Sequence, residues 1–107
     1  MSFFGLFKQP DINSGVQDFL KTNPAVLLDV RTKEEYEAGH IEKSVNLPLQ
    51  RIEEVQGKIT DKSTPLFVYC QSGARSASAV SALKKMGYVN AVNIGGISRY
   101  GGRIVKK

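Results

Sequence analysis

The stretch at residues 66–76 reads Leu-Phe-Val-Tyr-Cys-Gln-Ser-Gly-Ala-Arg-Ser. Its first five residues form a short apolar run, which is typical of a strand buried on both faces of a parallel sheet. Small and polar residues follow, and from Arg75 to Met86 the chain has the periodicity of a helix. The stretch is therefore predicted to bring the end of a buried strand, a loop and the start of a helix to one point of the molecule.

Apolar runs and helical patterns alternate on both sides of this stretch. Further strands are predicted at 25–30, 44–47 and 91–94, with a tight turn at Gly95-Gly96. Helices are predicted after the turn at 10–14, between Thr32 and Gly39, and along 49–59. This order predicts an α/β fold with a mainly parallel sheet of four to five strands and helices on both faces.

Two helices carry local signals that fix their position. Thr32 and Glu35 have the spacing of a capping box, which predicts the start of the short helix that ends near Gly39. Val16, Phe19 and Leu20 follow the i, i+3, i+4 spacing, which places them on one face of the first helix.

Length and composition indicate one domain over residues 1–107, with a loosely ordered segment at 1–10. Hydrophobic residues make up 41% and charged residues 23%, as in an ordinary globular protein. Cys70 is the only cysteine and His40 the only histidine, so neither an intramolecular disulfide nor a zinc site is expected. No apolar run is long enough for a membrane span, and the protein is expected in the cytoplasm.

The charge pattern bears on the class of ligand. The net charge of +5 and the isoelectric point of about 9.5 favour small anionic substrates. The basic residues are scattered along the chain, and none of their runs exceeds a pair, so nucleic acid is not an expected partner.

The loop after the apolar run carries the chemistry. Successive backbone N–H groups of such a loop, together with the first turn of the next helix, can form a cradle for an anion. Gly73 can supply a positive φ, and Arg75 adds a permanent cation. A thiolate at Cys70 would be stabilised in this setting, which lowers its pKa and makes it a nucleophile toward anionic substrates.

Each of these residues also has a purely structural interpretation. Cys70 can be a small apolar residue at a strand end, and Arg75 can be a solvated residue of the first helical turn. Ser72 and Ser76 can donate hydrogen bonds to a bound sulfur or anion, or can be ordinary loop residues. The combination of Cys70, Gly73 and Arg75 at a strand-to-helix junction favours the functional interpretation.

Three segments together resemble the rhodanese homology family. Residues 27–49 resemble its N-terminal signature, residues 68–76 its active-site loop, and residues 90–102 its C-terminal signature around Gly-Gly. The chain is similar to short, single-domain bacterial members. The resemblance implies a thiosulfate sulfurtransferase that works through a cysteine persulfide and needs no cofactor.

Carried over by position, the resemblance also implies residue roles. Cys70 is the nucleophile, and Asp29 and Arg31 form a structural polar pair under the site. The substrate-binding residues are those of the loop and the first helical turn, namely Gln71, Ser72, Gly73, Ala74, Arg75 and Ser76. The implied partners are a small anionic sulfur donor, such as thiosulfate or a persulfide, and an external acceptor, which is cyanide, a thiol or a protein.

Loop length separates the resembling classes. Sulfurtransferases have a six-residue loop, which here runs from Cys70 to Arg75. Phosphatases and arsenate reductases of related shape have their arginine one position later, where this chain has Ser76. Three alternatives stay open: a small-anion phosphatase or reductase, a non-catalytic sulfur-carrier or binding module, and a redox sensor based on Cys70 sulfenic acid.

Overall fold

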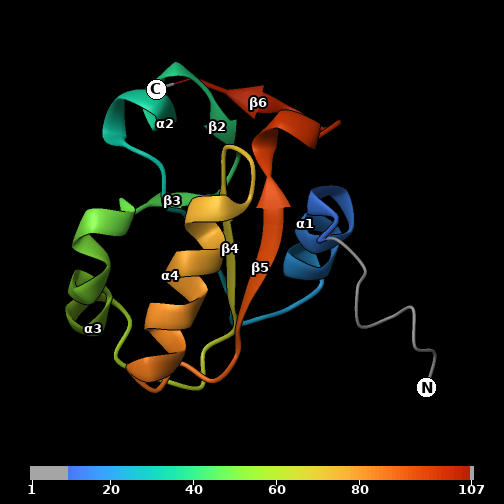
Figure 1. Cartoon of the computed structure of the whole chain (residues 1–107). Coiled ribbons are helices and arrows are strands. Elements are labelled where there is room, and N and C mark those ends of the chain that lie inside the picture. The colour runs from blue at the N-terminus through green and yellow to red at the C-terminus, as the bar shows by residue number, and fades with distance from the viewer. Residues whose placement is uncertain (1–9, 107) are drawn as a thin grey trace, which may run out of the picture.

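Four parallel strands form the central sheet of the computed structural model, which describes residues 10–106. Their order across the sheet is β3-β1-β4-β5, so β4 lies between two neighbours. The bounds are β1 (Val26–Asp29), β3 (Val45–Asn46), β4 (Leu66–Cys70) and β5 (Ala91–Gly96). The predicted α/β fold is confirmed, with four strands in the main sheet (Figure 1).

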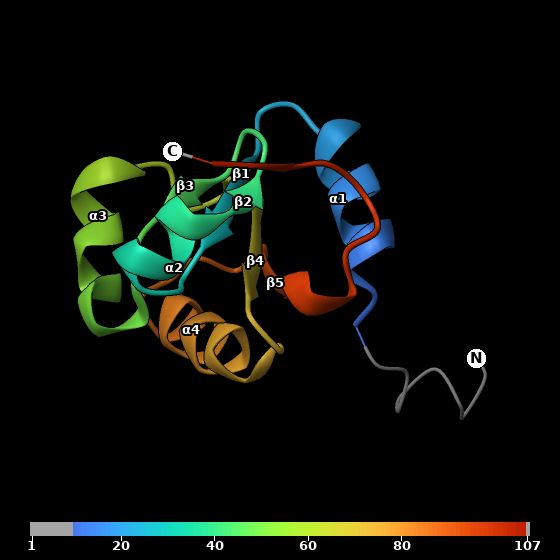
Figure 2. The same cartoon turned by 90° about the horizontal axis from the view of Figure 1, so that it is seen from above.

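Helices cover both faces of this sheet (Figures 1 and 2). On one face lies α1 (Ile12–Leu20), and on the other lie α3 (Val55–Lys58) and α4 (Ala74–Lys85). The short helix α2 (Lys33–Ala38) lies beyond the carboxyl ends of the strands, beside a small antiparallel sheet. That sheet pairs β2 (His40–Ile41) with β6 (Ile104–Val105). The described residues also include the 3₁₀ helices η2 (Leu49–Glu54) and η3 (Ile97–Arg99).

The core has two parts because side chains alternate along each strand. Leu28 and Val68 point to the side of α3 and α4, where they pack with other buried apolar residues. Leu27 and Tyr69 point to the opposite side and pack against α1. Both faces of β1 and β4 are therefore buried, as their continuous apolar runs predicted.

The buried face of α1 differs from the prediction. Ile12 and Val16 are buried, whereas Leu20 is 53% exposed. The helix comes so close to the sheet at Gly15 that a Cβ there would overlap the side chain of Ile94. This close approach turns the face through Gly15 inward and leaves Leu20 at the edge.

Helix ends agree with the local signals. Thr32 and Glu35 form both hydrogen bonds of the predicted capping box at the start of α2. At the end of α4, Gly87 adopts a φ of 103°, and its N–H donates to the carbonyl of Lys84. The left-handed residue after a helix is the usual place of glycine, because glycine has no Cβ to clash.

Two predicted segments take a different form. The stretch 49–59 is divided between η2 and α3, with a non-helical Arg51 inside η2. Gly95 and Gly96 extend β5 and pair with Tyr69 and Cys70, so the tight turn predicted there is wrong. The register shifts next to this pairing, and Gly95 has a φ of 108°, a conformation that glycine adopts without strain.

None of the helices within residues 10–106 is long and apolar enough to cross a membrane. The prediction of a loosely ordered segment at 1–10 concerns residues that, apart from Pro10, lie outside the described part of the chain.

Candidate active site

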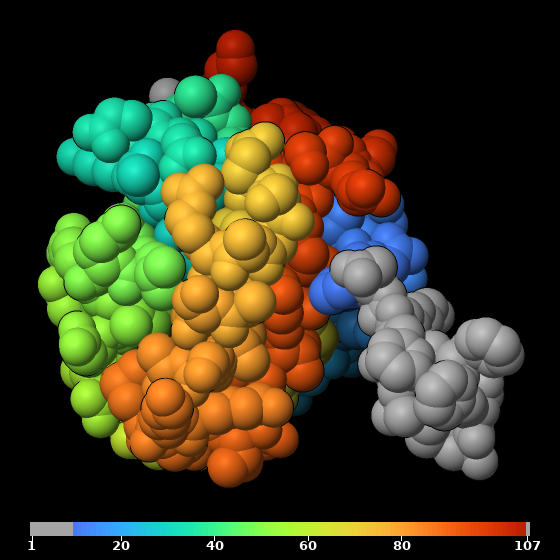
Figure 3. All heavy atoms as spheres, in the orientation of Figure 1, coloured from blue at the N-terminus to red at the C-terminus, as the bar shows by residue number. Residues whose placement is uncertain are grey.

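The predicted site lies where the central strand β4 ends. Cys70 is the last residue of β4, and the loop that follows leads directly into α4, whose N-cap is Gly73. The carboxyl ends of parallel strands and the N-termini of the following helices meet at such a point, where ligands of open α/β sheets bind. In Figure 3 the loop and the start of α4 lie at the surface beside α2.

The Cys70 sulfur faces the loop and the first turn of α4. Its Sγ accepts hydrogen bonds from the N–H of Gly73 (3.0 Å), the N–H of Ser76 (3.3 Å) and the hydroxyl of Ser76 (3.4 Å). Burial raises the pKa of the Cys70 thiol, but these hydrogen bonds outweigh burial, so that its pKa lies below the ordinary value. These donors therefore favour the thiolate form of Cys70 over the thiol.

Gly73 gives the loop its shape. Its φ of 104° lies in the left-handed region, which an L side chain rarely adopts. Its N–H donates to the Cys70 sulfur. The positive φ expected at Gly73 is present, at the residue where the loop passes into α4.

Gly96 of β5 lets the neighbouring strand close against the loop. A Cβ at Gly96 would lie 2.6 Å from the Cα of Ser72 and would also overlap the carbonyl oxygen of Gln71. The same carbonyl accepts a hydrogen bond from the N–H of Ser98 (3.2 Å). The loop is thus held from the β5 side by backbone contacts that need a glycine.

Asn93 of β5 fixes the loop from below, and sequence reasoning did not single it out. Its Nδ2 donates to the carbonyl of Gly73 (3.2 Å), and its Oδ1 accepts from the Ser76 hydroxyl (2.7 Å) and from the N–H of Gly95 (3.0 Å). The one available signal was a polar residue inside the apolar run 91–94. Asn93 thereby contacts both residues that donate hydrogen bonds to the Cys70 sulfur.

The Arg75 side chain is paired with a carboxylate of α2. Its Nη1 and Nη2 donate to Oε1 and Oε2 of Glu35 on α2, at 2.7 and 3.0 Å. The Arg75 guanidinium lowers the pKa of the Glu35 carboxyl to about 2. The capping box identified Glu35 only as part of a helix start, so this second contact was missed.

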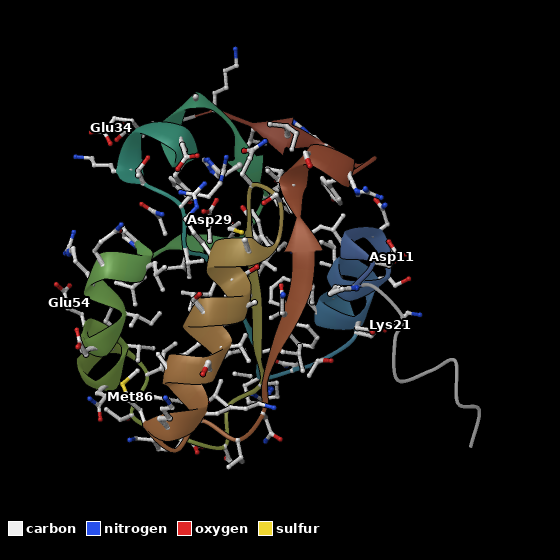
Figure 4. The ribbon with its side chains drawn as sticks, in the orientation of Figure 1. Asp11, Lys21, Asp29, Glu34, Glu54 and Met86 are labelled. Carbon is white, nitrogen blue, oxygen red and sulfur yellow. The ribbon has the colours of Figure 1, made fainter. Side chains whose placement is uncertain are left out.

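A second arginine lies under the loop. Arg31 is buried and paired with the buried Asp29, with 2.8 Å between Nη2 and Oδ2. It also donates to the carbonyl of Gly39 (2.7 Å) and contacts Oε1 of Gln71 (3.4 Å). Figure 4 shows Asp29 inside the molecule, close to the loop that follows β4. The pair therefore links β1, α2 and the loop.

A pocket of about 360 Å³ lies against the loop on the side of β5. Exposed Ser72 and Ala74 form part of its wall, and Arg99 lines it from η3. Cys70 is only 1% exposed and lies behind this wall. Its sulfur accepts a hydrogen bond from Gly73, which itself lines the pocket. Within residues 10–106 no group of three or more His, Cys, Asp and Glu side chains is arranged to hold a metal ion.

Comparison with known families and curated proteins agrees with this geometry. The family described as "Rhodanese-like domain" matches residues 14–102. The chain is 40% identical over 85 residues to an uncharacterized protein, YqhL, of Bacillus subtilis (strain 168), covering 78% of this chain and 66% of that protein. It is 35% identical over 71 residues to the thiosulfate sulfurtransferase PspE of Escherichia coli (strain K12), covering 65% and 68% of the two chains. The chain thus spans about two thirds of the length of these relatives.

A solved structure has the same fold. It is described as a rhodanese with anions from E. coli, and it superposes with a TM-score of 0.72 at 32% identity. The match covers 78% of this chain and 99% of that one.

Proposed function

The chain belongs to the rhodanese-like domain family, and from this premise we propose that it is a sulfurtransferase that carries a sulfane sulfur as a persulfide on Cys70. The observation that carries the proposal is the environment of the Cys70 sulfur, which accepts three hydrogen bonds from Gly73 and Ser76. These donors lower the pKa of the thiol, and a thiolate is the form that attacks sulfur.

In the first step, the Cys70 thiolate attacks the outer sulfur of a donor such as thiosulfate. A new sulfur–sulfur bond forms at Cys70, the sulfur–sulfur bond of thiosulfate breaks, and sulfite leaves with the bonding electron pair. The N–H groups of the loop are fixed before the reaction, so they can stabilise the negative charge on the transferred sulfur without reorganising.

In the second step, an acceptor thiolate or cyanide attacks the outer sulfur of the persulfide. The Cys70 thiolate then leaves, and the starting state is restored. Because residues 1–107 contain one cysteine, the acceptor has to come from outside them. The proposed partners are therefore a small anionic donor and an external thiol or protein, in a compartment that keeps a lone cysteine reduced.

Steady-state kinetics with thiosulfate and cyanide test this proposal through the formation of thiocyanate. A double-displacement cycle predicts parallel lines in double-reciprocal plots, because the donor product leaves before the acceptor reacts. Cys70→Ala should abolish the reaction while the far-ultraviolet circular dichroism stays native. Thiocyanate formation by Cys70→Ala at the rate of the natural protein would exclude Cys70 as the sulfur carrier.

A sulfur-carrier module is the second candidate, and the burial of Cys70 favours it. Cys70 is 1% exposed, so small molecules reach its sulfur slowly unless the loop moves. A carrier would accept and release one sulfur with little steady-state turnover.

Parallel assays with p-nitrophenyl phosphate identify the phosphatase alternative, which predicts hydrolysis of the ester and no thiocyanate.

A further inference from the structure

Arg75 of the loop and Arg31, which contacts Gln71 of the loop, are both held by carboxylates. Arg75 is paired with Glu35 through two contacts, and Arg31 is paired with Asp29. Because each guanidinium is paired with a carboxylate, the net charge of these two ion pairs is zero. Attraction of an anion to the loop then depends on the N–H groups around the Cys70 sulfur. A doubly charged ligand gains less from such a site than it would from a free guanidinium.

The Glu35 carboxylate has a fixed position. Its Oε1 accepts the capping-box hydrogen bond from the N–H of Thr32 (2.9 Å) and a further hydrogen bond from the Thr32 hydroxyl (3.1 Å). The same oxygen accepts from Nη1 of Arg75. The helix cap thus holds the carboxylate next to Arg75, where it neutralises the cation of the loop.

The Glu35–Arg75 pair is close enough to the sulfur to affect a bound anion. Arg75 lies one residue before Ser76, whose N–H and hydroxyl contact the Cys70 sulfur. The pair is also accessible, since both side chains are about one-third exposed, at 34% and 33%. An incoming anion can therefore compete with Glu35 for Arg75.

We propose that Glu35 is a specificity-determining residue which, by pairing with Arg75, disfavours doubly charged donors such as thiosulfate relative to singly charged persulfide donors. This inference rests on the proposed sulfurtransferase function. Glu35 acts through Arg75 and does not contact the reacting sulfur. Its negative charge repels a dianion about twice as strongly as a monoanion, and it occupies the two guanidinium N–H groups that suit an oxyanion best.

Glu35→Gln tests the proposal, because glutamine also completes a capping box and the helix start is retained. We expect the KM for thiosulfate to fall by about three- to tenfold and the KM for 2-hydroxyethyl persulfide to fall by a smaller factor. The ratio of kcat/KM for the two donors should therefore shift toward thiosulfate. The shift should shrink at high salt, because exposed charges are screened.

Glu34→Gln is the matched control. It removes the same charge from the same turn of α2, and Glu34 is exposed at the outer side of the helix (Figure 4). We expect its donor ratio to equal that of the natural protein. A change in Glu34→Gln as large as that in Glu35→Gln would overturn the proposal, because it would reflect net charge alone.

Two further outcomes separate this inference from the proposed function. If the natural protein transfers sulfur but Glu35→Gln keeps the donor ratio or raises the KM for thiosulfate, the specificity role of Glu35 is wrong and the sulfurtransferase function stands. Such a rise would show that Glu35 merely holds Arg75 in place for the donor. If the natural protein takes sulfur from neither donor, the proposed function itself fails.

Discussion

At the scale of single residues, burial and hydrogen bonding act on Cys70 in opposite directions. Burial in the apolar core disfavours the charged form of the thiol, whereas the donors of Gly73 and Ser76 favour it. The donors have the larger effect on the pKa of Cys70, because the loop holds them in place beside the sulfur. A cysteine in the same core without these donors would be an inert apolar residue.

Ser76→Ala tests the contribution of the hydroxyl to the thiolate. The Ser76 hydroxyl has one proton and three acceptors in reach, namely Oδ1 of Asn93, the carbonyl of Gly73 and the Cys70 sulfur. We expect the variant to raise the pKa of Cys70 and to slow its attack at neutral pH by about fivefold, which corresponds to one hydrogen bond of about 1 kcal/mol. The absorbance of the thiolate at different pH values measures the change. An unchanged pKa would mean that the proton stays with Asn93.

Glu35 predicts a pH-dependent stability. Its pKa is lowered from 4.5 to about 2, so its pairing with Arg75 stabilises the fold fully above about pH 4.5 and is lost as the pH falls toward about 2. Because both side chains are about one-third exposed, the free energy of unfolding of Glu35→Gln should be lower by only about 0.2–1 kcal/mol at pH 7. Urea unfolding at several pH values should show the two proteins converging through this window. A difference that stays constant down to pH 2 would contradict the assigned role of the ion pair.

Contacts between residues close in sequence could be predicted, and contacts between residues far apart in sequence could not. The loop chemistry of Cys70 and Gly73 is local, so the order of residues was enough to place both at a strand-to-helix junction. The contact between Arg75 and Glu35 spans 40 residues, and that between Ser76 and Asn93 spans 17. Such contacts depend on how α2 and β5 are placed, and no local pattern contains that information.

At the scale of elements, the closeness of β5 to the loop determines the shape of the site. Gly95 and Gly96 complete β5 beside Tyr69 and Cys70, and the backbone of β5 then lies directly under Gln71 and Ser72. Two glycines in sequence are a common turn signal, and this is why a turn was predicted there. Their function in the structure is to remove side chains where two backbones meet.

Gly96→Ala should disrupt this contact. The added methyl group would overlap the loop backbone, which has no flexible side chain that could move away, so we expect a loss of about 1–3 kcal/mol in the free energy of unfolding. The rate of sulfur transfer should also fall, because the loop is displaced from Cys70. Gly57→Ala in α3 is the control, since its Cβ meets no neighbour within 4 Å and alanine favours the helix by about 1 kcal/mol. Equal stability and activity of the two variants would show that the close approach of β5 is unimportant.

The predicted bounds of β1, β3, β4, β5, α2 and α4 agree with the structure within two residues, whereas α1 begins inside the predicted turn at 10–14, and β2 and β6 were not predicted. The apolar run of β4 and the capping box of α2 carry strong local signals. The strands β2 and β6 have two residues each and pair across more than 60 positions of the chain, so neither has a pattern of its own. The division of 49–59 into η2 and α3 likewise depends on packing around the buried Ile52 and Val55.

At the scale of the whole molecule, the sheet order places Cys70 at the centre. The strand β4 lies between β1 and β5, so its carboxyl end is surrounded by neighbours on both sides. Asp29 at the end of β1 pairs with Arg31 just after it, β5 contributes Asn93, and α2 contributes Glu35. The fold therefore brings residues from distant parts of the sequence to the loop that follows Cys70.

Mass spectrometry of the intact protein after incubation with thiosulfate shows whether Cys70 carries a persulfide sulfur. Each chain should gain one sulfur atom, peptide mapping should place it on Cys70, and a thiol reductant should remove it. Cys70→Ala should gain none under the same conditions. An unmodified natural protein after treatment with both thiosulfate and a small persulfide, or a sulfur equally bound by Cys70→Ala, would contradict the account.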